Sequence, residues 1–218
     1  MLVAEPSTRV AGKSDRCLVL DAAFNPPTVA HWELALAGAR VSKADWILIQ
    51  LSSANVDKGI SGADLGQRLY MLDLMAAEDE RVGVSACSHA RFVDKALALS
   101  KISNKTKFIF AIGFDTLERL FDPNYYTNFT VELETLFAEA EFVVANRGEK
   151  DASALDDYLR QKPQSDYKNK IHQTTLAQRF IRISSSETRD LVMGNQPFAH
   201  LVPDGISYLI EEMGLYKD

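Results

Sequence analysis

Cysteine is scarce in this chain of 218 residues, which contains only Cys17 and Cys87. Two cysteines are too few for the disulfide framework of a small secreted protein, and Cys17 lies in an apolar run that is typical of a buried strand. A reducing compartment is the simpler interpretation. The sequence therefore predicts a soluble intracellular protein of the cytoplasm, the nucleus or both.

Long apolar runs are also missing, because none approaches the roughly 20 residues that a membrane-spanning helix needs. Residues 1–16 hold Pro, Ser, Gly and charges in place of a sustained apolar segment, which argues against a secretory signal and predicts a flexible tail. The net charge of −6 argues against a broad basic surface for nucleic acid or anionic lipid. We expect neither as a partner, whereas a homo-oligomer is compatible with the sequence.

Several well-known catalytic patterns are absent as well. The chain has no G-x-S-x-G nucleophile elbow, no Walker A sequence and no glycine fingerprint for dinucleotides. His89, His172 and His200 have no partners at metal-ligand spacing, and there is no cysteine pair for zinc. We therefore expect no metal site built from side chains alone.

Short apolar runs alternate with helical patterns along the chain. These runs are rich in Val, Ile, Leu and Phe and do not alternate with polar residues, which is typical of parallel strands covered on both faces. The sequence predicts an α/β fold, a single Rossmann-like doubly wound parallel sheet with helices on both faces, formed by residues 17–218. Strands are expected at residues 17–20, 45–51, 82–86, 107–112, 141–145 and 179–183.

The segment FNPPTVAH, residues 24–31, follows the first predicted strand. Thr28 can cap a helix whose first turn contains His31. In a sheet of this kind, the free N–H groups of such a helix point over the strand ends, where anions bind. A Pro-Pro turn beside a surface histidine is the simpler alternative, but the location favours a phosphate site next to His31.

The segment ISSSETR, residues 183–189, opens a later helix. Ser185 or Ser186 is expected to cap that helix, and the guanidinium of Arg189 could reach back to an anion at its N-terminus. By itself the segment reads as a cap followed by an exposed arginine. Two such helix N-termini at strand ends, one with His31 and one with Arg189, favour phosphate binding.

Three other strand ends carry polar groups. Lys58 lies in a polar loop that could close over a ligand, although a solvated lysine is the default interpretation. Gly113 gives a tight exit from the strongest strand, and Asp115 either accepts a hydrogen bond from a ribose hydroxyl or caps a helix. Asn146 and Arg147 occupy an equivalent strand end.

These motifs resemble those of a known family. FNPPTVAH resembles the [HT]-x-G-H signature of the nucleotidyltransferase superfamily, and ISSSETR resembles its ISST-x-I-R signature. GFDTLERL and the ending LVPDGISYLIEEMGLY resemble segments of nicotinamide mononucleotide adenylyltransferases. NVDK, GFDTLERLFDPNYY and SSSETR are similar to the fungal branch. The resemblance spans about residues 17–216.

The sequence also departs from the family pattern. Ala30 stands where the family usually has Gly, and Asp21-Ala22-Ala23 replaces Gly-Gly-Ser/Thr. The usual Trp segment that stacks on nicotinamide is not recognisable. Four aromatic residues are candidates to take its place: Phe92, Phe114, Tyr125 and Tyr126.

The resemblance implies transfer of AMP from ATP to nicotinamide mononucleotide (NMN), giving NAD and pyrophosphate, with Mg²⁺ bound mainly through the ATP phosphates. The implied catalytic residues are His31, Lys58 and Arg189. The implied ATP-binding residues are Phe24, Asn25, Thr28, His31, Lys58, Gly113, Asp115, Ser185, Ser186 and Arg189. The implied NMN-binding residues are Ala22, Ala23, Phe24, Asn25, Phe92 and Arg147.

Three alternatives remain open from the sequence. The acceptor could be nicotinate mononucleotide, phosphopantetheine or a substrate of cytidylyl transfer. The protein could also be a non-catalytic nucleotide-binding relative, or an ATP hydrolase that needs no acceptor. Retention of His31, Lys58 and Arg189 together favours transfer.

Overall fold

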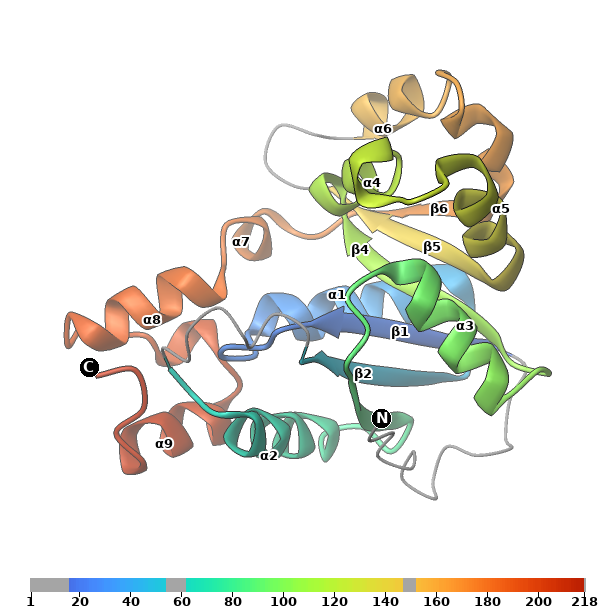
Figure 1. Ribbon diagram of the computed structural model, residues 1–218. Helices are drawn as coiled ribbons and strands as arrows, with labels where there is room; N and C mark the ends of the chain where they lie inside the picture. The colour runs from blue at the N-terminus through green and yellow to red at the C-terminus, as the bar shows by residue number, and fades with distance from the viewer. Residues whose placement is uncertain (1–15, 54–61, 147–151, 218) are drawn as a thin grey trace.

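A computed structural model describes residues 16–53, 62–146 and 152–217, and one parallel sheet runs through these residues (Figure 1). Its six strands lie in the order β3-β2-β1-β4-β5-β6, and every neighbouring pair is parallel. The strands are β1 (Arg16–Ala22), β2 (Trp46–Ser52), β3 (Val82–Cys87), β4 (Lys107–Gly113), β5 (Ala140–Ala145) and β6 (Ile171–Thr174). The direction of winding reverses between β1 and β4, which is where an open α/β sheet forms its binding crevice.

Helices connect the strands and cover both faces. The α-helices are α1 (Val29–Ser42), α2 (Leu65–Ala76), α3 (Phe92–Ile102), α4 (Phe114–Leu120), α5 (Phe129–Glu139), α6 (Ala152–Tyr158), α7 (Gln178–Ile181), α8 (Ser185–Met193) and α9 (Asp204–Glu212). Short 3-10 turns lie at Pro123–Tyr125, Gln164–Lys170 and Ala199–Leu201. The predicted fold class is confirmed.

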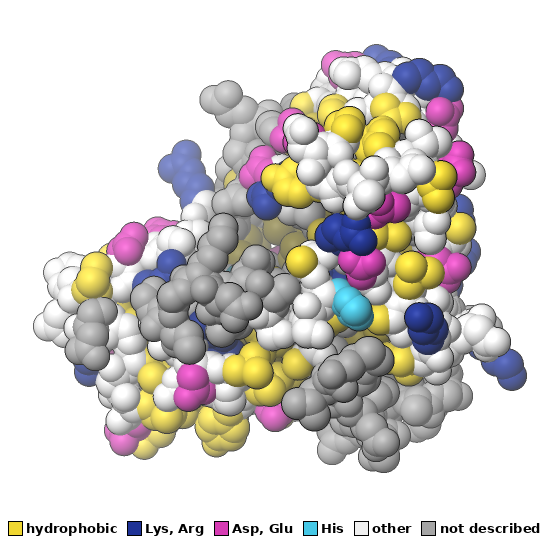
Figure 2. Space-filling view, viewed as in Figure 1, with side chains coloured by type: hydrophobic (Ala, Val, Ile, Leu, Met, Phe, Trp, Pro, Cys, Tyr) yellow, Lys and Arg dark blue, Asp and Glu magenta, His cyan; other side chains and the backbone are white. Residues whose placement is uncertain are grey.

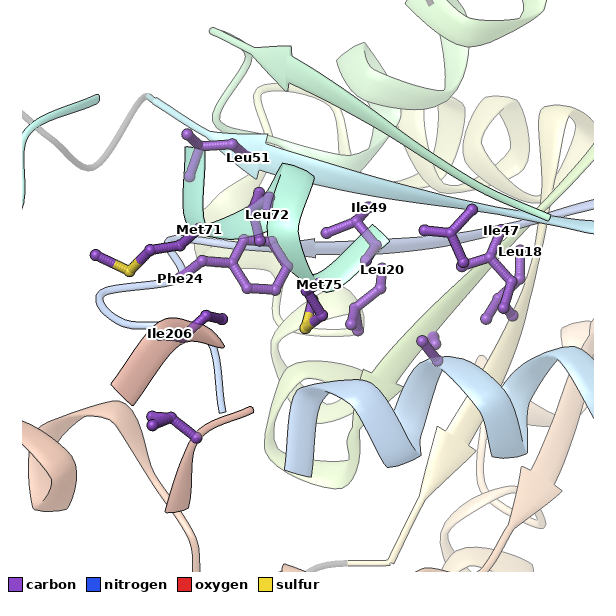
Figure 3. Packing of buried hydrophobic residues seen from close by; sticks show 14 of the residues in the cluster. Leu18, Leu20, Phe24, Ile47, Ile49, Leu51, Met71, Leu72, Met75 and Ile206 are labelled. Carbon is purple, nitrogen blue, oxygen red and sulfur yellow. The ribbon is translucent and has the colours of Figure 1, made fainter. Parts of the chain in front are cut away.

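Two hydrophobic layers hold the sheet, because successive side chains of a strand point to opposite faces. Leu18 and Leu20 of β1 face a layer that contains residues of α1, α2 and α9, whereas Cys17 and Val19 face a layer with residues of α3, α4 and α5. Figure 3 shows the first layer close up, with side chains from the sheet, from α2 and from the C-terminal part of the chain in contact.

The sheet begins one residue earlier than the sequence predicts. Arg16, assigned to the flexible tail, is the first residue of β1, and its Nε donates to the carbonyl oxygen of Ser42, 2.7 Å away. The rest of the predicted tail, residues 1–15, lies outside the described residues.

The prediction for the last strand is wrong. Residues 179–183 fall mostly in the short helix α7, and the sixth strand is Ile171–Thr174, which pairs with β5. This edge strand has only one neighbour and reads IHQT, so it lacks the apolar run of a central strand. The apolar residues that suggested a strand, Phe180 and Ile181, instead pack against a small cluster that includes Ala37 of α1.

Within the described residues, no helix is both long enough and apolar enough to span a membrane.

Candidate functional site

The turn between β1 and α1 is organised by a reciprocal pair of hydrogen bonds. Thr28 is the N-cap of α1, as predicted, and its hydroxyl accepts from the backbone N–H of His31 at 3.3 Å. In return, the backbone N–H of Thr28 donates to Nδ1 of His31 at 3.1 Å. Because Nδ1 is an acceptor here, the proton of a neutral imidazole must lie on Nε2.

Burial determines the charge of His31. It lowers the pKa of this histidine to about 4, so the ring is neutral at pH 7. The ring also lies against Phe24, with 5.1 Å between the ring centroids. His31 therefore offers a neutral Nε2–H donor at the N-terminus of α1, where backbone N–H groups already favour an anion.

Phe24 fixes the turn in the core. Its φ of 46° lies in the left-handed region, which is strained for a bulky residue, and its side chain is only 1% exposed. Figure 3 shows the ring among apolar side chains of the first layer. The Phe24 ring is therefore buried in the core, and only the backbone of this residue can contact a ligand. Ala22 and Ala23 before it are partly buried.

The start of α8 contacts this turn directly. Ser185 Oγ donates to the carbonyl oxygen of Pro26 at 2.7 Å, and a terminal nitrogen of Arg189 donates to that of Asn25, also at 2.7 Å. The other terminal nitrogen of Arg189 donates to Ser186 Oγ at 3.2 Å. The structure thus brings together the two helix N-termini that the sequence singled out, although 159 residues separate Pro26 from Ser185.

The prediction that Ser185 or Ser186 caps this helix is wrong. Ser184 is the N-cap, and its hydroxyl accepts from the N–H of Glu187 at 3.1 Å. Ser185 and Ser186 lie one and two positions further along, inside the first turn. Their hydroxyls are therefore available to Pro26 and Arg189.

Gly113 ends β4 and caps α4, but its turn does not require a glycine. The exit from the strand is tight, as predicted, because β4 ends at Gly113 and α4 begins at the next residue, but the φ of −82° is one that any residue can adopt. A Cβ atom at this position would meet no heavy atom of the described chain within 4 Å. A small side chain at this position would therefore meet no described residue. Asp115 lies in the first turn of α4, and its predicted contact with a ribose stays a prediction.

Other predicted site residues are spread more widely. Lys58 and Arg147 lie outside the described residues. Phe92 begins α3 and packs edge-on against Phe110, with 5.3 Å between centroids. Asn146 Oδ1 accepts from the N–H of Leu176 at 2.7 Å and so joins the end of β5 to the segment after β6.

The three other aromatic residues that could stack on nicotinamide differ in their exposure and in their contacts. Phe114 is 4% exposed, so its ring is taken up by the core. Tyr126 is tied by its hydroxyl, which donates to the carbonyl oxygen of Leu120 at 2.6 Å. Tyr125 is 53% exposed.

The sequence did not reveal a buried polar network beside the turn. Lys95 of α3 forms an ion pair with Asp21 of β1, and their side chains are only 3% and 6% exposed. Gln50 Nε2 donates to Asp21 Oδ1 at 3.1 Å, and Lys95 Nζ donates to Ser52 Oγ at 3.2 Å. The signal that could have revealed it is the place of Lys95 among the apolar positions of FVDKALAL, on the buried side of α3.

The described residues form no cluster of metal-binding side chains. Within residues 16–53, 62–146 and 152–217, no group of three or more His, Cys, Asp or Glu side chains is placed to hold a metal ion. Figure 2 shows acidic and basic side chains intermixed on one face of the molecule.

Residues 19–191 match the family model described as Cytidylyltransferase-like. The chain belongs to this family. Its membership confirms the nucleotidyltransferase superfamily that the two signatures indicated.

Individual relatives share smaller parts or only the fold. A Schizosaccharomyces pombe protein named "Putative nicotinamide mononucleotide adenylyltransferase" is 32% identical over 162 residues, which are 72% of this chain and 61% of that protein. The chain thus matches less than two thirds of that relative's length. Two solved structures of Plasmodium falciparum nicotinic acid mononucleotide adenylyltransferase, complexed with APC or with NaAD, have TM-scores of 0.71 and 0.70 at 15% and 16% identity. Each covers 93% of this chain and 98% of its own, and the likeness shows the shared fold.

Proposed function

We propose that the protein is a nicotinamide-nucleotide adenylyltransferase, which transfers AMP from ATP to NMN and releases pyrophosphate. The observation that carries the proposal is the contact between the first turn and α8. Ser185 donates to the carbonyl oxygen of Pro26, and Arg189 donates to that of Asn25. These two bonds hold Arg189 beside α1, the helix that presents the neutral Nε2–H of His31. One donor and one guanidinium at two adjoining helix N-termini suit a phosphate chain.

The chemistry requires positioning more than proton transfer. An oxygen of the NMN phosphate attacks the α-phosphorus of ATP in line, a new P–O bond forms, and the bond from the α-phosphorus to the bridging oxygen breaks. The electron pair leaves with pyrophosphate. Because a phosphate monoester is already a competent nucleophile, catalysis rests on orientation and on stabilisation of charge.

Each group in the site has a role in this proposal. His31 donates through Nε2–H to an oxygen near the reacting phosphorus. Arg189 has further N–H groups besides the one bonded to Asn25, and these bind the β- and γ-phosphates together with Lys58. In this proposal the nucleoside lies at the end of β4, beside Gly113, and Asp115 in the first turn of α4 accepts a hydrogen bond from its ribose.

Mg²⁺ fits this arrangement as an ion that arrives on the nucleotide. Mg²⁺ is commonly held by phosphates, water and one or two carboxylates rather than by an all-protein cage. The lack of a three-ligand cluster in the described part of the chain is compatible with that mode. When bound, the ion would neutralise charge on the phosphates.

The identity of the acceptor divides into two candidates. NMN is favoured because the 32% identical relative bears that name, whereas the fold relatives at 15% and 16% identity are named for nicotinic acid mononucleotide. Both acceptors present the same nucleophilic phosphate and differ only in the amide or carboxylate on the ring.

The test is product formation from ATP and Mg²⁺ with NMN, with nicotinate mononucleotide, and without acceptor. Pyrophosphate should appear only with an acceptor, and NAD should be identified by mass in the NMN reaction. Phosphate release without acceptor would indicate a hydrolase instead. Binding of ATP without product from either acceptor would overturn the proposed enzyme and leave a nucleotide-binding protein.

A further inference from the structure

The position of Arg189 depends on the β6–α8 connection, residues 175–184. This connection runs from the edge of the sheet through α7 to the start of α8, and Figure 1 shows α8 beyond the end of the sheet. A connection of that length can span about 30 Å when it is extended, so chain length alone leaves α8 free to lie in many places. Contacts of α8 and of the connection before it must therefore fix the helix and its arginine.

Asn146, the residue after β5, holds the beginning of the connection with two hydrogen bonds. Its backbone N–H donates to the carbonyl oxygen of Thr174 at 3.4 Å, just beyond the last paired residues of β5 and β6. Its side-chain Oδ1 accepts from the N–H of Leu176 at 2.7 Å. The side-chain oxygen thus takes the place of a main-chain carbonyl where the ladder between the two strands ends.

The connection then packs on α1, the helix that presents His31. Leu176 is 8% exposed and forms a small apolar cluster with Ala37 of α1 and Ala145 at the end of β5. Because this cluster joins the connection to the side of α1, the helix that bears His31 at its N-terminus also supports the chain that leads to Arg189. The partly buried residues that pack against the cluster come from α1 and α7: Leu34, Phe180 and Ile181.

At its far end the connection leads into the contact between α8 and the turn after β1. Ser185 donates to the carbonyl oxygen of Pro26, and Arg189 donates to that of Asn25, each at 2.7 Å. Hydrogen bonds weaken steeply when their length or angle departs from the optimum, so both bonds require α8 to keep a fixed place. The connection and the two bonds act on the same helix, and loosening the connection should weaken the bonds.

We propose that Asn146 is a positioning residue for Arg189. By fixing the N–H of Leu176 it seats the β6–α8 connection on α1, so that α8 meets the turn after β1 with its arginine toward the phosphate chain of the nucleotide. The inference rests on the proposed function for the identity of that ligand, a nucleoside triphosphate. Asn146 acts through the main chain of Leu176 and not on the ligand itself.

A test without ligand combines Asn146→Leu with Ser185→Ala in a double-mutant cycle, measured by urea denaturation. Ser185→Ala removes the bond to Pro26 and should raise the unfolding equilibrium constant about threefold to tenfold in the wild-type background. In the Asn146→Leu background the same change should raise it less than about twofold, because the bond is already weakened. Equal effects in the two backgrounds would mean that Asn146 stabilises only its own surroundings, and would overturn the positioning role.

Two matched variants show whether the hydrogen bond is responsible. Asn146→Asp keeps an acceptor oxygen for the N–H of Leu176, so the full effect of Ser185→Ala should return. Asn104→Leu makes the same change at an exposed site before β4 and should also leave the effect of Ser185→Ala at its full size. An effect in Asn146→Asp as small as in Asn146→Leu would refute the role of the acceptor. If Asn146→Leu does not fold, Asn146→Ala, which adds no apolar bulk, replaces it in the cycle.

The affinity for a non-hydrolysable ATP analogue, measured by calorimetry, tests the consequence for binding. Asn146→Leu should weaken the analogue about threefold to tenfold in the wild-type background and less than about twofold in an Arg189→Met background. Losses that add fully would show that Asn146 does not act through Arg189, which would overturn the assignment. A wild-type protein that binds no ATP analogue would overturn the proposed function instead, and the unfolding cycle would still decide whether Asn146 positions α8.

Discussion

Two polar regions adjoin at the carboxyl ends of β1 and β2, and they use their charges in opposite ways. The Asp21–Lys95 network, made of Asp21, Gln50, Ser52 and Lys95, pairs its buried cation with its own carboxylate. The first-turn site consists of Thr28, His31, Ser185 and Arg189. Its side chains bond mostly to main-chain atoms, and the Nε2–H of His31 and further N–H groups of Arg189 can still donate to a ligand.

The difference separates a structural role from a binding role. A buried pair that satisfies itself holds α3 against β1 and has little charge left for a ligand. Donors whose partners are main-chain carbonyls or helix caps are fixed in direction and still carry uncommitted N–H groups, which is the preorganisation that charge stabilisation needs. Stability should therefore respond mainly to the first region, and turnover mainly to the second.

The largest effect on stability is expected for Lys95→Met. Removing one partner leaves the Asp21 carboxylate buried and unpaired, which should cost about 3–5 kcal/mol of the free energy of unfolding, measured by urea denaturation. The double variant Asp21→Asn with Lys95→Met should recover much of this loss. Lys101→Met, at an exposed site of the same helix, is the control. A loss below about 1 kcal/mol would mean that the pair is not buried in solution.

The pH dependence of stability should reveal the neutral state of His31. Its pKa in the folded protein, about 4, lies below the ordinary value of 6.5. The unfolded chain therefore binds the proton first as the pH falls, and this contribution to stability, complete above about 6.5, is lost down to about 4. At pH 5 the loss should be about 2 kcal/mol relative to His31→Gln. Equal slopes for the wild type and His31→Gln would contradict a buried neutral ring; His200→Gln, at an exposed site, should behave like the wild type.

A smaller effect is expected for the cap. Thr28→Val keeps the shape of the side chain and removes the hydroxyl that accepts from His31, so the free energy of unfolding should fall by about 1 kcal/mol. Thr28→Ser should retain most of the stability. Thr135→Val on the exposed part of α5 controls for the loss of a hydroxyl in a helix. A Thr28→Val protein as stable as the wild type would show that the cap contributes nothing.

The sequence predicted the elements whose signals are local. Five of the six strands and the Thr28 cap follow from apolar runs and from capping chemistry, which act within a few residues. The sequence also anticipated that the first turns of α1 and α8 would lie together, although it did so by assuming a strand at residues 179–183, where the structure has α7.

The remaining features depend on contacts between distant segments. The strand β6 has little apolar character because it lies at the edge of the sheet, with β5 as its neighbour on one side only. Arg68 reads as an ordinary polar helix residue, yet only 4% of it is exposed in the fold, and Lys95 differs from a surface lysine only in the helical face that it occupies. Tertiary burial, which no short pattern encodes, gives these residues their roles.

In the proposed mechanism His31 donates to the reacting phosphates, so the decisive measurement is the rate of NAD formation from ATP and NMN by His31→Ala. Removal of a preorganised donor should lower kcat about 10² to 10³-fold while circular dichroism and the urea midpoint at pH 7.5 show a folded protein. His200→Ala should leave the rate unchanged. A folded His31→Ala protein that forms NAD at the wild-type rate would show that His31 does not donate to the reacting phosphates.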